Sequence, residues 1–198
     1  MRDNDLAVLP KDNTEYSTKK YWDERYEKGS HDVVFDWFKT YSDIKDLINT
    51  YIKKDAKILM LGCGNSSLSE DMYNDGYSEI VNIDFSEVVI DQMKERCSQT
   101  TMKWEVMDVL DLKYNSNEFD AIIDKGTMDA LMCEKGDVWD PSPQLISVVT
   151  REIDGVERKR FLTRDAFELE VLTLGTSFHY FAYICKKKKE SGSLDSLE

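Results

Sequence analysis

Short apolar runs alternate with amphipathic stretches between residues 57 and 124, and this alternation constrains the fold more than any other feature. The run ILML, closed by Gly62, is typical of a parallel strand that is buried on both faces. Three further runs predict strands at 79–84, 102–108 and 119–124. Helical patterns at 66–76 and 86–97 separate the first three strands. Strands that alternate with helices in this way favour a doubly wound α/β sheet.

The segments on either side of this core predict another helix and a terminal hairpin. Apolar residues recur at helical spacing at Ile44, Leu47, Ile48, Tyr51 and Ile52. Apolar residues alternate with glutamates over 167–171, and a second apolar run at 178–185 follows Gly175, which predicts an antiparallel pair of strands. The chain has 198 residues, which fit one domain without a separate substrate domain of ordinary size.

The charge balance bears on the class of partner. Asp and Glu total 39 against 26 Lys and Arg, a formal net charge of −13, and such a field repels nucleic acid and anionic membranes. A basic protein partner is favoured by the same field, although acidity also serves solubility alone. We therefore expect no binding to nucleic acid or to membranes.

The cysteines bear on metal binding and on the compartment. Four scattered cysteines lack CxxC spacing and neighbouring histidines, so we expect no bound metal. The N-terminal apolar stretch is too short for a signal peptide, and no segment approaches transmembrane length. A cytoplasmic protein is the expectation.

Glycines follow the first predicted strand, where parallel sheets bind ligands. Gly62 and Gly64 lack a Cβ and allow a ligand to approach the backbone. The third glycine of the GxGxxG dinucleotide fingerprint is replaced by Ser67, which disfavours a nicotinamide-dependent oxidoreductase. Asp84 lies 20 residues after Gly64, the spacing at which a carboxylate reaches the ribose hydroxyls. The alternative is that Asp84, with Ser86, caps the following helix.

The third and fourth predicted strands also end in polar residues. Asp108 is suited to accept a hydrogen bond from an adenine amine, and Val109 to cover the ring, unless the two simply form a surface turn. Asp124, Lys125 and Gly126 follow the fourth strand. All four strands thus end where open α/β sheets bind their ligands.

Several motifs together resemble those of the class I S-adenosylmethionine-dependent methyltransferases, and within that family the elongation factor 1-alpha lysine methyltransferases. The resemblance extends over roughly Tyr21 to Leu131 and rests on YWDERY, FDWF, ILMLGCGNSSLS, NIDFSEVVI, WEVMDV and FDAIIDKGTMDAL. It implies a seven-strand sheet ordered 3-2-1-4-5-7-6 with strand seven antiparallel. It also implies S-adenosylmethionine as cofactor and a lysine of elongation factor 1-alpha as the methyl acceptor.

The resemblance also implies roles for individual residues. Gly62 is expected under the cofactor, Asp84 and Phe85 at the ribose and adenine side, and Asp108 and Val109 at the adenine. Lys125 is expected at the methionine end. Trp22, Tyr26 and Trp37 are expected to fold over the cofactor as a lid, where aromatic faces attract a sulfonium cation; core packing is the alternative.

The chain departs from this family after Pro143. A helix, a proline-glycine-glycine turn and a fifth strand are expected there, but QLISVVTREIDGVERKRF is much shorter, so that about one helix and one strand are missing or rewritten. Two segments can pair with the exposed fourth strand: Leu145–Val149, or the terminal hairpin moved inward. The predicted organisation is a lid at 1–42, a cofactor-binding core at 43–131, an altered substrate side at 132–185 and a polar tail at 186–198.

The resulting functional expectation is a monomeric protein-lysine methyltransferase. Asp124 and Asp129 lie where they can orient the incoming amine, although both are equally suited to start a helix, and we assign no catalytic base. A small-molecule methyltransferase is one alternative. A catalytically weak adenosyl-binding module is the other, because the altered region belongs to the substrate side.

Overall fold

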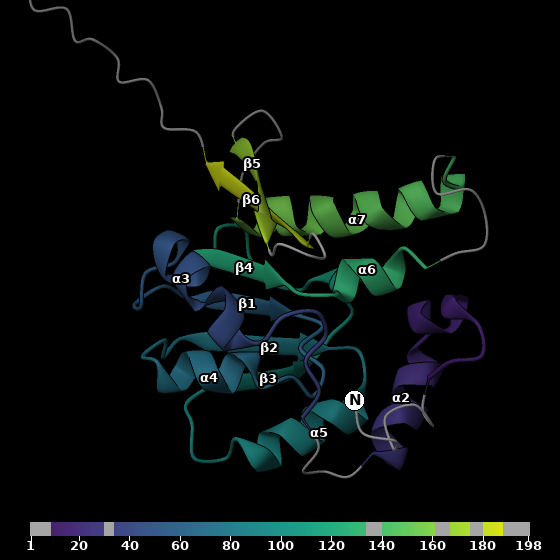
Figure 1. Ribbon diagram of the computed structural model, residues 1–198, viewed down its shortest axis with the longest axis horizontal. Coiled ribbons are helices and arrows are strands. Elements are labelled where there is room, and N and C mark those ends of the chain that lie inside the picture. The colour runs from purple at the N-terminus through teal and green to yellow at the C-terminus, as the bar shows by residue number, and fades with distance from the viewer. Residues whose placement is uncertain (1–8, 30–33, 134–139, 161–166, 175–179, 188–198) are drawn as a thin grey trace, which may run out of the picture.

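A parallel four-stranded sheet forms the centre of the protein (Figure 1). The computed structural model describes residues 9–29, 34–133, 140–160, 167–174 and 180–187. The strands are β1 (Ile58–Leu61), β2 (Ile80–Asp84), β3 (Lys103–Val106) and β4 (Ala121–Asp124). They lie in the order β3-β2-β1-β4, and every neighbouring pair is parallel. The predicted α/β class with a parallel sheet is confirmed.

Two apolar clusters cover the two faces of this sheet. Ile58 and Met60 of β1 belong to one cluster, whereas Leu59 and Leu61 belong to the other. This division follows from the alternation of side chains along a strand. The all-apolar sequence of β1 therefore reflects burial on both faces, as predicted from ILML.

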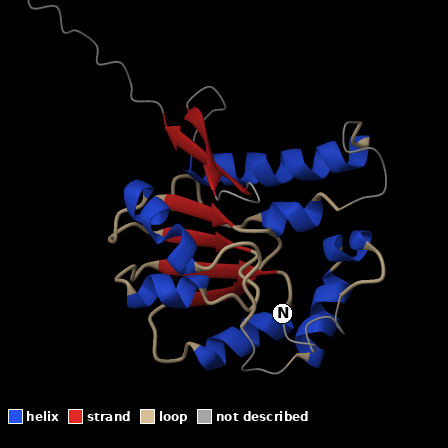
Figure 2. Ribbon diagram, viewed as in Figure 1, coloured by secondary structure: helices blue, strands red, loops and turns tan. Residues whose placement is uncertain are grey.

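Three helices cover the first face; one precedes β1, and the other two connect β1 to β2 and β2 to β3 (Figure 2). They are α3 (Tyr41–Tyr51), α4 (Leu68–Asn74) and α5 (Glu87–Arg96). Gly76, in a left-handed conformation with φ of 101°, follows α4 and turns the chain toward β2. Ile48 of α3 is buried in the apolar cluster of this face, so the predicted amphipathic stripe packs on the sheet.

The opposite face is covered by a short turn and two helices. These are η2 (Val109–Asp111), α6 (Thr127–Leu131) and α7 (Pro143–Arg160), and α7 packs against η2, α6 and β4. No helix within the described ranges is both long and apolar enough to cross a membrane.

The expectation that Leu145–Val149 substitutes for a strand is wrong, because these residues lie inside α7. Ser142 explains the difference: its hydroxyl accepts a hydrogen bond from the Leu145 amide at 3.1 Å, and Pro143 follows it at the first helical position. The helix expected after β4 is thus retained rather than lost.

The C-terminal strands β5 (Phe167–Leu174) and β6 (Tyr180–Lys187) pair with each other in antiparallel register. They form a sheet of their own, and neither pairs with β4 in the part of the chain that the structure describes. The inward movement of the hairpin, the second expected route for pairing β4, is therefore not observed there. The predicted turn at 175–177 and the tail beyond 187 lie outside the described residues.

Two N-terminal elements precede α3. The first is a short turn, η1 (Asn13–Ser17), and Asp12 and Glu15 form a capping box at its start. Helix α2 (Lys19–Lys28) follows and packs against α5.

Candidate functional site

A cavity of about 180 Å³ opens where the carboxyl ends of the four parallel strands meet. One water molecule needs only about 10–15 Å³, so this space suits a small organic ligand. All nine residues expected from the sequence to hold the cofactor line it: Trp22, Tyr26, Trp37, Gly62, Asp84, Phe85, Asp108, Val109 and Lys125. The fold thus brings residues as far apart in sequence as Trp22 and Lys125 to the wall of the same cavity.

The glycine loop after β1 is closely packed on its outer side. A Cβ added at Gly62 would lie 2.1 Å from the hydroxyl oxygen of Thr127, and Gly62 has a φ of 51°. A Cβ at Gly64, which has the same φ, would lie 3.0 Å from the hydroxyl oxygen of Tyr26. Both the left-handed conformation and the close neighbours require glycine here.

Asp84 joins this loop to the start of α5. One carboxylate oxygen accepts a hydrogen bond from the Gly64 amide at 3.0 Å, and the other accepts from the Ser86 amide at 2.9 Å. The residue is only 5% exposed, and burial raises the pKa of its carboxyl to about 6 despite these two bonds. Asp84 therefore has a capping contact and also faces the cavity. The helix-cap interpretation and the ligand-site interpretation each describe part of its environment.

Asp108 and Val109 form the next side of the cavity. Asp108 is exposed, and its carboxylate accepts a hydrogen bond from the Leu110 amide at 2.8 Å, which caps η2. Val109 is buried in the apolar cluster of the second face. A polar acceptor and an apolar surface thus lie next to each other at the end of β3.

The N-terminal aromatics form one cluster over the cavity. Trp37 lies edge-on to Phe35, with ring centroids 4.9 Å apart, and also contacts Tyr16 and Trp22. Trp22 stacks on Tyr26 at 5.8 Å, and Tyr26 is buried in the main core. The aromatics therefore pack on the core and line the cavity at the same time.

Hydrogen bonds hold this N-terminal segment to the strand ends. Lys125 donates to the Trp37 carbonyl at 2.9 Å and forms an ion pair with Asp36 at 3.2 Å. Asp36 also accepts hydrogen bonds from the hydroxyls of Ser66 and Ser67. The side chains of Lys125 and Asp36 are only 13% and 10% exposed, so water screens their pairing weakly.

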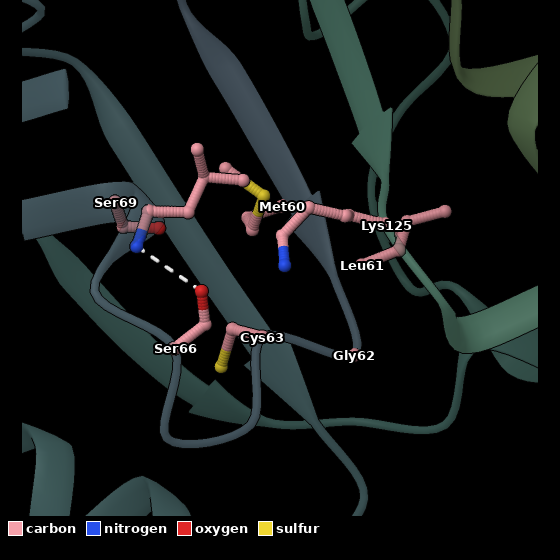
Figure 3. A pocket seen from close by; sticks show the side chains of 8 residues that line it. Met60, Leu61, Gly62, Cys63, Ser66, Ser69 and Lys125 are labelled. Atoms are coloured by element: carbon pink, nitrogen blue, oxygen red, sulfur yellow. Dashed lines mark hydrogen bonds between the residues drawn. The ribbon is translucent and has the colours of Figure 1, made fainter. Parts of the chain in front are cut away.

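A second, smaller cavity of about 20 Å³ lies directly beneath the glycine loop (Figure 3). Figure 3 shows Lys125 reaching from the end of β4 across the end of β1, with Cys63 and Ser66 on the loop beside it. Burial raises the pKa of the Cys63 thiol well above its usual range, so the thiol is a neutral part of the wall.

Asp124 has a structural contact at the start of α6. Its carboxylate accepts hydrogen bonds from the amides of Thr127 and Met128, both at 3.2 Å. The helix-starting interpretation is therefore correct for Asp124, which nevertheless remains exposed. Asp129 lies in the first turn of α6 and is exposed as well.

Sequence reasoning did not single out Asp36, Ser66 or Thr127. Thr127 donates its hydroxyl hydrogen to the Leu61 carbonyl at 3.0 Å and so joins α6 to the end of β1. The only signal for Asp36 in the sequence is its place between Phe35 and Trp37, because its partners lie 30 or more positions away.

Comparisons with known proteins agree with this geometry. Residues 52–177 match the family model described as a methyltransferase domain. EEF1A lysine methyltransferase 4 of Bos taurus is 31% identical over 207 residues, which cover 93% of this chain and 81% of that protein. The eEF1A lysine and N-terminal methyltransferase of Mus musculus is 40% identical over 135 residues, which cover 67% of this chain and 19% of that protein.

A solved structure supports the fold. The structure described as "Conversion of a Disulfide Bond into a Thioacetal Group during Echinomycin Biosynthesis" has a TM-score of 0.55 and 14% identity, and it covers 85% of this chain and 90% of its own. The family model covers more than half of the sequence, including all four strands of the parallel sheet and the loops after them. The chain therefore belongs to the methyltransferase domain family.

Proposed function

We propose that this chain transfers a methyl group from S-adenosylmethionine to a lysine side chain of translation elongation factor 1-alpha. The two relatives named above are methyltransferases of eEF1A, and one of them aligns with most of this chain. The observation that carries the proposal is the cavity of about 180 Å³ at the strand ends, because every residue expected to hold the cofactor lines it.

The residues of the cavity fit an adenosyl ligand. Gly62 and Gly64 line the cavity with backbone alone, so a ligand can approach the loop closely. We assign Asp84 and Phe85 to the ribose and adenine side, and Asp108 with Val109 to the adenine itself, since a carboxylate and an apolar surface suit an amine on a flat ring.

The aromatic cluster is assigned to the sulfonium end of the cofactor. When bound, S-adenosylmethionine supplies an electrophilic methyl group on a positively charged sulfur. The faces of Trp22, Tyr26 and Trp37 attract such a cation and exclude water from its surroundings. Lys125 fixes this cover in place through the Trp37 carbonyl and Asp36, at the end of the cavity assigned to the methionine part.

The acceptor amine has to approach as a positioned neutral nucleophile. We assign its orientation to the acidic end of β4, where Asp124 and Asp129 are both exposed. The formal net charge of −13 favours the approach of a basic segment of the substrate. We assign no group as general base.

Radiolabelled methyl transfer tests this function. The purified protein is incubated with labelled S-adenosylmethionine and purified elongation factor 1-alpha, and the labelled residue is located by mass spectrometry. We expect label on a lysine. Label on small molecules of a cell extract alone would favour a small-molecule methyltransferase, and cofactor binding without transfer would favour a binding module.

We further propose that the enzyme acts as a monomer in the cytoplasm, without nucleic acid or membrane partners. The similarity to EEF1A lysine methyltransferase 4 supports the cytoplasmic location. The acidic net charge supports the absence of nucleic acid and membrane partners. The division of the chain into a lid at 1–42, a cofactor-binding core at 43–131, a substrate side at 132–185 and a tail at 186–198 belongs to the same proposal.

A further inference from the structure

A buried glutamate on α7 lies outside every role assigned so far. Glu152 is 1% exposed, and no N–H or O–H group of the described residues donates a hydrogen bond to either oxygen of its carboxyl. An ionised carboxylate in such surroundings loses its hydration without replacement, which is strongly unfavourable. The group therefore needs either a cation or a proton of its own.

The neighbouring elements supply carboxylates rather than a cation. Asp124 of β4 lies within hydrogen-bonding reach of Glu152, and Asp129 of α6 adds a second negative charge nearby. From η2, Asp108 caps its own turn and Asp111 is paired with Lys113 at 2.5 Å. On α7 itself, Arg151 donates to the Leu110 carbonyl at 3.3 Å.

The two members of the Glu152–Asp124 pair differ in their surroundings. Burial raises the pKa of the Asp124 carboxyl as well, but Asp124 keeps contact with solvent and accepts hydrogen bonds from two backbone amides, which favour its ionised form. Glu152 has neither advantage. Burial, followed by the charge of Asp124, raises the pKa of the Glu152 carboxyl to about 9, so the shared proton belongs to Glu152 at neutral pH.

We propose that Glu152 is a positioning residue whose carboxyl group donates a hydrogen bond to Asp124, so that the Asp124 carboxylate faces the acceptor amine. This inference rests on the proposed function, because the amine is the acceptor of that reaction. A neutral donor behind Asp124 fixes the carboxylate without cancelling its charge. A lysine or arginine at position 152 would fix the carboxylate equally well but would cancel its negative charge.

The same pair connects α7 to the cofactor side of the site. Asp124 holds the start of α6, from which Thr127 donates to the end of β1. The loss of the hydrogen bond from Glu152 should disturb the acceptor side first, because the hydrogen bonds of Asp84 to the glycine loop and to α5 involve neither Glu152 nor Asp124.

Thermal melting as a function of pH tests where the proton lies. The unfolded chain releases the Glu152 proton near its ordinary pKa, whereas the folded chain keeps it up to about pH 9, so folding becomes less favourable as pH rises between these values. The Glu152→Gln variant lacks this titration. We expect the melting temperatures of the two proteins to diverge from pH 5 to pH 8, with the variant increasingly the more stable.

Glu95→Gln is the matched control for melting, because it makes the same change at an exposed glutamate of α5. Its melting temperature should follow the wild type at both pH values. A gap between wild type and Glu152→Gln that stays constant from pH 5 to pH 8 would overturn the assignment of the proton.

Kinetics with purified elongation factor 1-alpha test the positioning role. Glu152→Leu removes the donor, so kcat/KM for the protein acceptor should fall by about tenfold or more while the Kd of S-adenosylmethionine stays within about twofold. Glu152→Gln keeps a donor at this position and should restore most of the transfer rate. Equal losses in both variants, or parallel losses of cofactor affinity and transfer, would contradict the inference.

These measurements separate the two levels of the proposal. If the wild-type protein binds S-adenosylmethionine but labels no lysine of elongation factor 1-alpha, the proposed function has failed before any variant is made. The melting experiment does not depend on turnover, so the proton assignment would still be supported or overturned by it.

Discussion

The carboxyl of Asp84 serves the fold and the cavity at the same time. Its two hydrogen bonds to backbone amides join the glycine loop to α5, while the residue also lines the cavity. The spacing from Gly64 could be read from the sequence, because a β-α-β unit has a nearly fixed length. The raised pKa could not, since it depends on how completely the surrounding elements bury the group.

The pKa of about 6 predicts how cofactor binding depends on pH. Only the ionised carboxylate accepts hydrogen bonds from both ribose hydroxyls, so affinity for S-adenosylmethionine should increase by about tenfold from pH 5 to pH 7 and then level off. Calorimetry at several pH values measures this. Asp84→Asn should bind weakly at every pH, whereas the exposed Asp91→Asn control should behave as wild type. Unchanged affinity with lowered stability in Asp84→Asn would leave only the capping role.

Trp37 and Tyr21 belong to the same aromatic cluster, but only Trp37 lines the cavity. Trp37→Ala should therefore weaken S-adenosylmethionine binding more than Tyr21→Ala, while both variants lose similar packing free energy. The ratio of their dissociation constants, compared with their melting temperatures, measures the difference. Equal affinities would mean that the aromatic cluster is only a packing unit.

At the scale of elements, the strands and the first-face helices were predictable because their signals are local. The stripe at Ile44–Ile52 carries the helical period, and the run ILML is closed by Gly62 and lies in a regular alternation of strands and helices. LISVV was misread because a short apolar run of β-branched residues is compatible with either kind of element. Two neighbouring features show that LISVV is helical. Ser142 caps the start of α7, and the spacing of Leu145, Val148 and Val149 continues to Glu152 at helical intervals.

The Ser142 cap gives a stability prediction for α7. Ser142→Ala removes the hydroxyl that accepts from the Leu145 amide and should lower the free energy of unfolding by about 1 kcal/mol. Ser147→Ala, at an exposed position inside the same helix, should change it little or raise it slightly, since alanine is the better helix former. Chemical denaturation measures both. A smaller effect for Ser142 than for Ser147 would mean that α7 begins elsewhere in solution.

At the scale of the whole molecule, the edge of the parallel sheet is the least predictable feature. β4 pairs with β1 on one side, and the described strands outside this sheet, β5 and β6, pair with each other. The family resemblance places a further strand beside β4, and the sequence after Pro143 gave two candidates that the structure does not use. Long-range pairing of this kind depends on segments far apart in the chain, which no local pattern specifies.

Hydrogen exchange tests this edge. The Ala121 amide donates toward β1, to the Lys57 carbonyl at 3.3 Å, so the alternation along a parallel strand directs the Ile123 amide the same way and the Ile122 amide outward. Residue-resolved exchange by NMR should therefore find Ile123 well protected and Ile122 exchanging much faster, although both residues are only partly exposed. Leu59 of β1, which lies between two strands, is the control and should be protected. If Ile122 were as protected as Ile123, another strand would have to pair with β4 in solution, and the four-stranded sheet would be only part of the folded sheet.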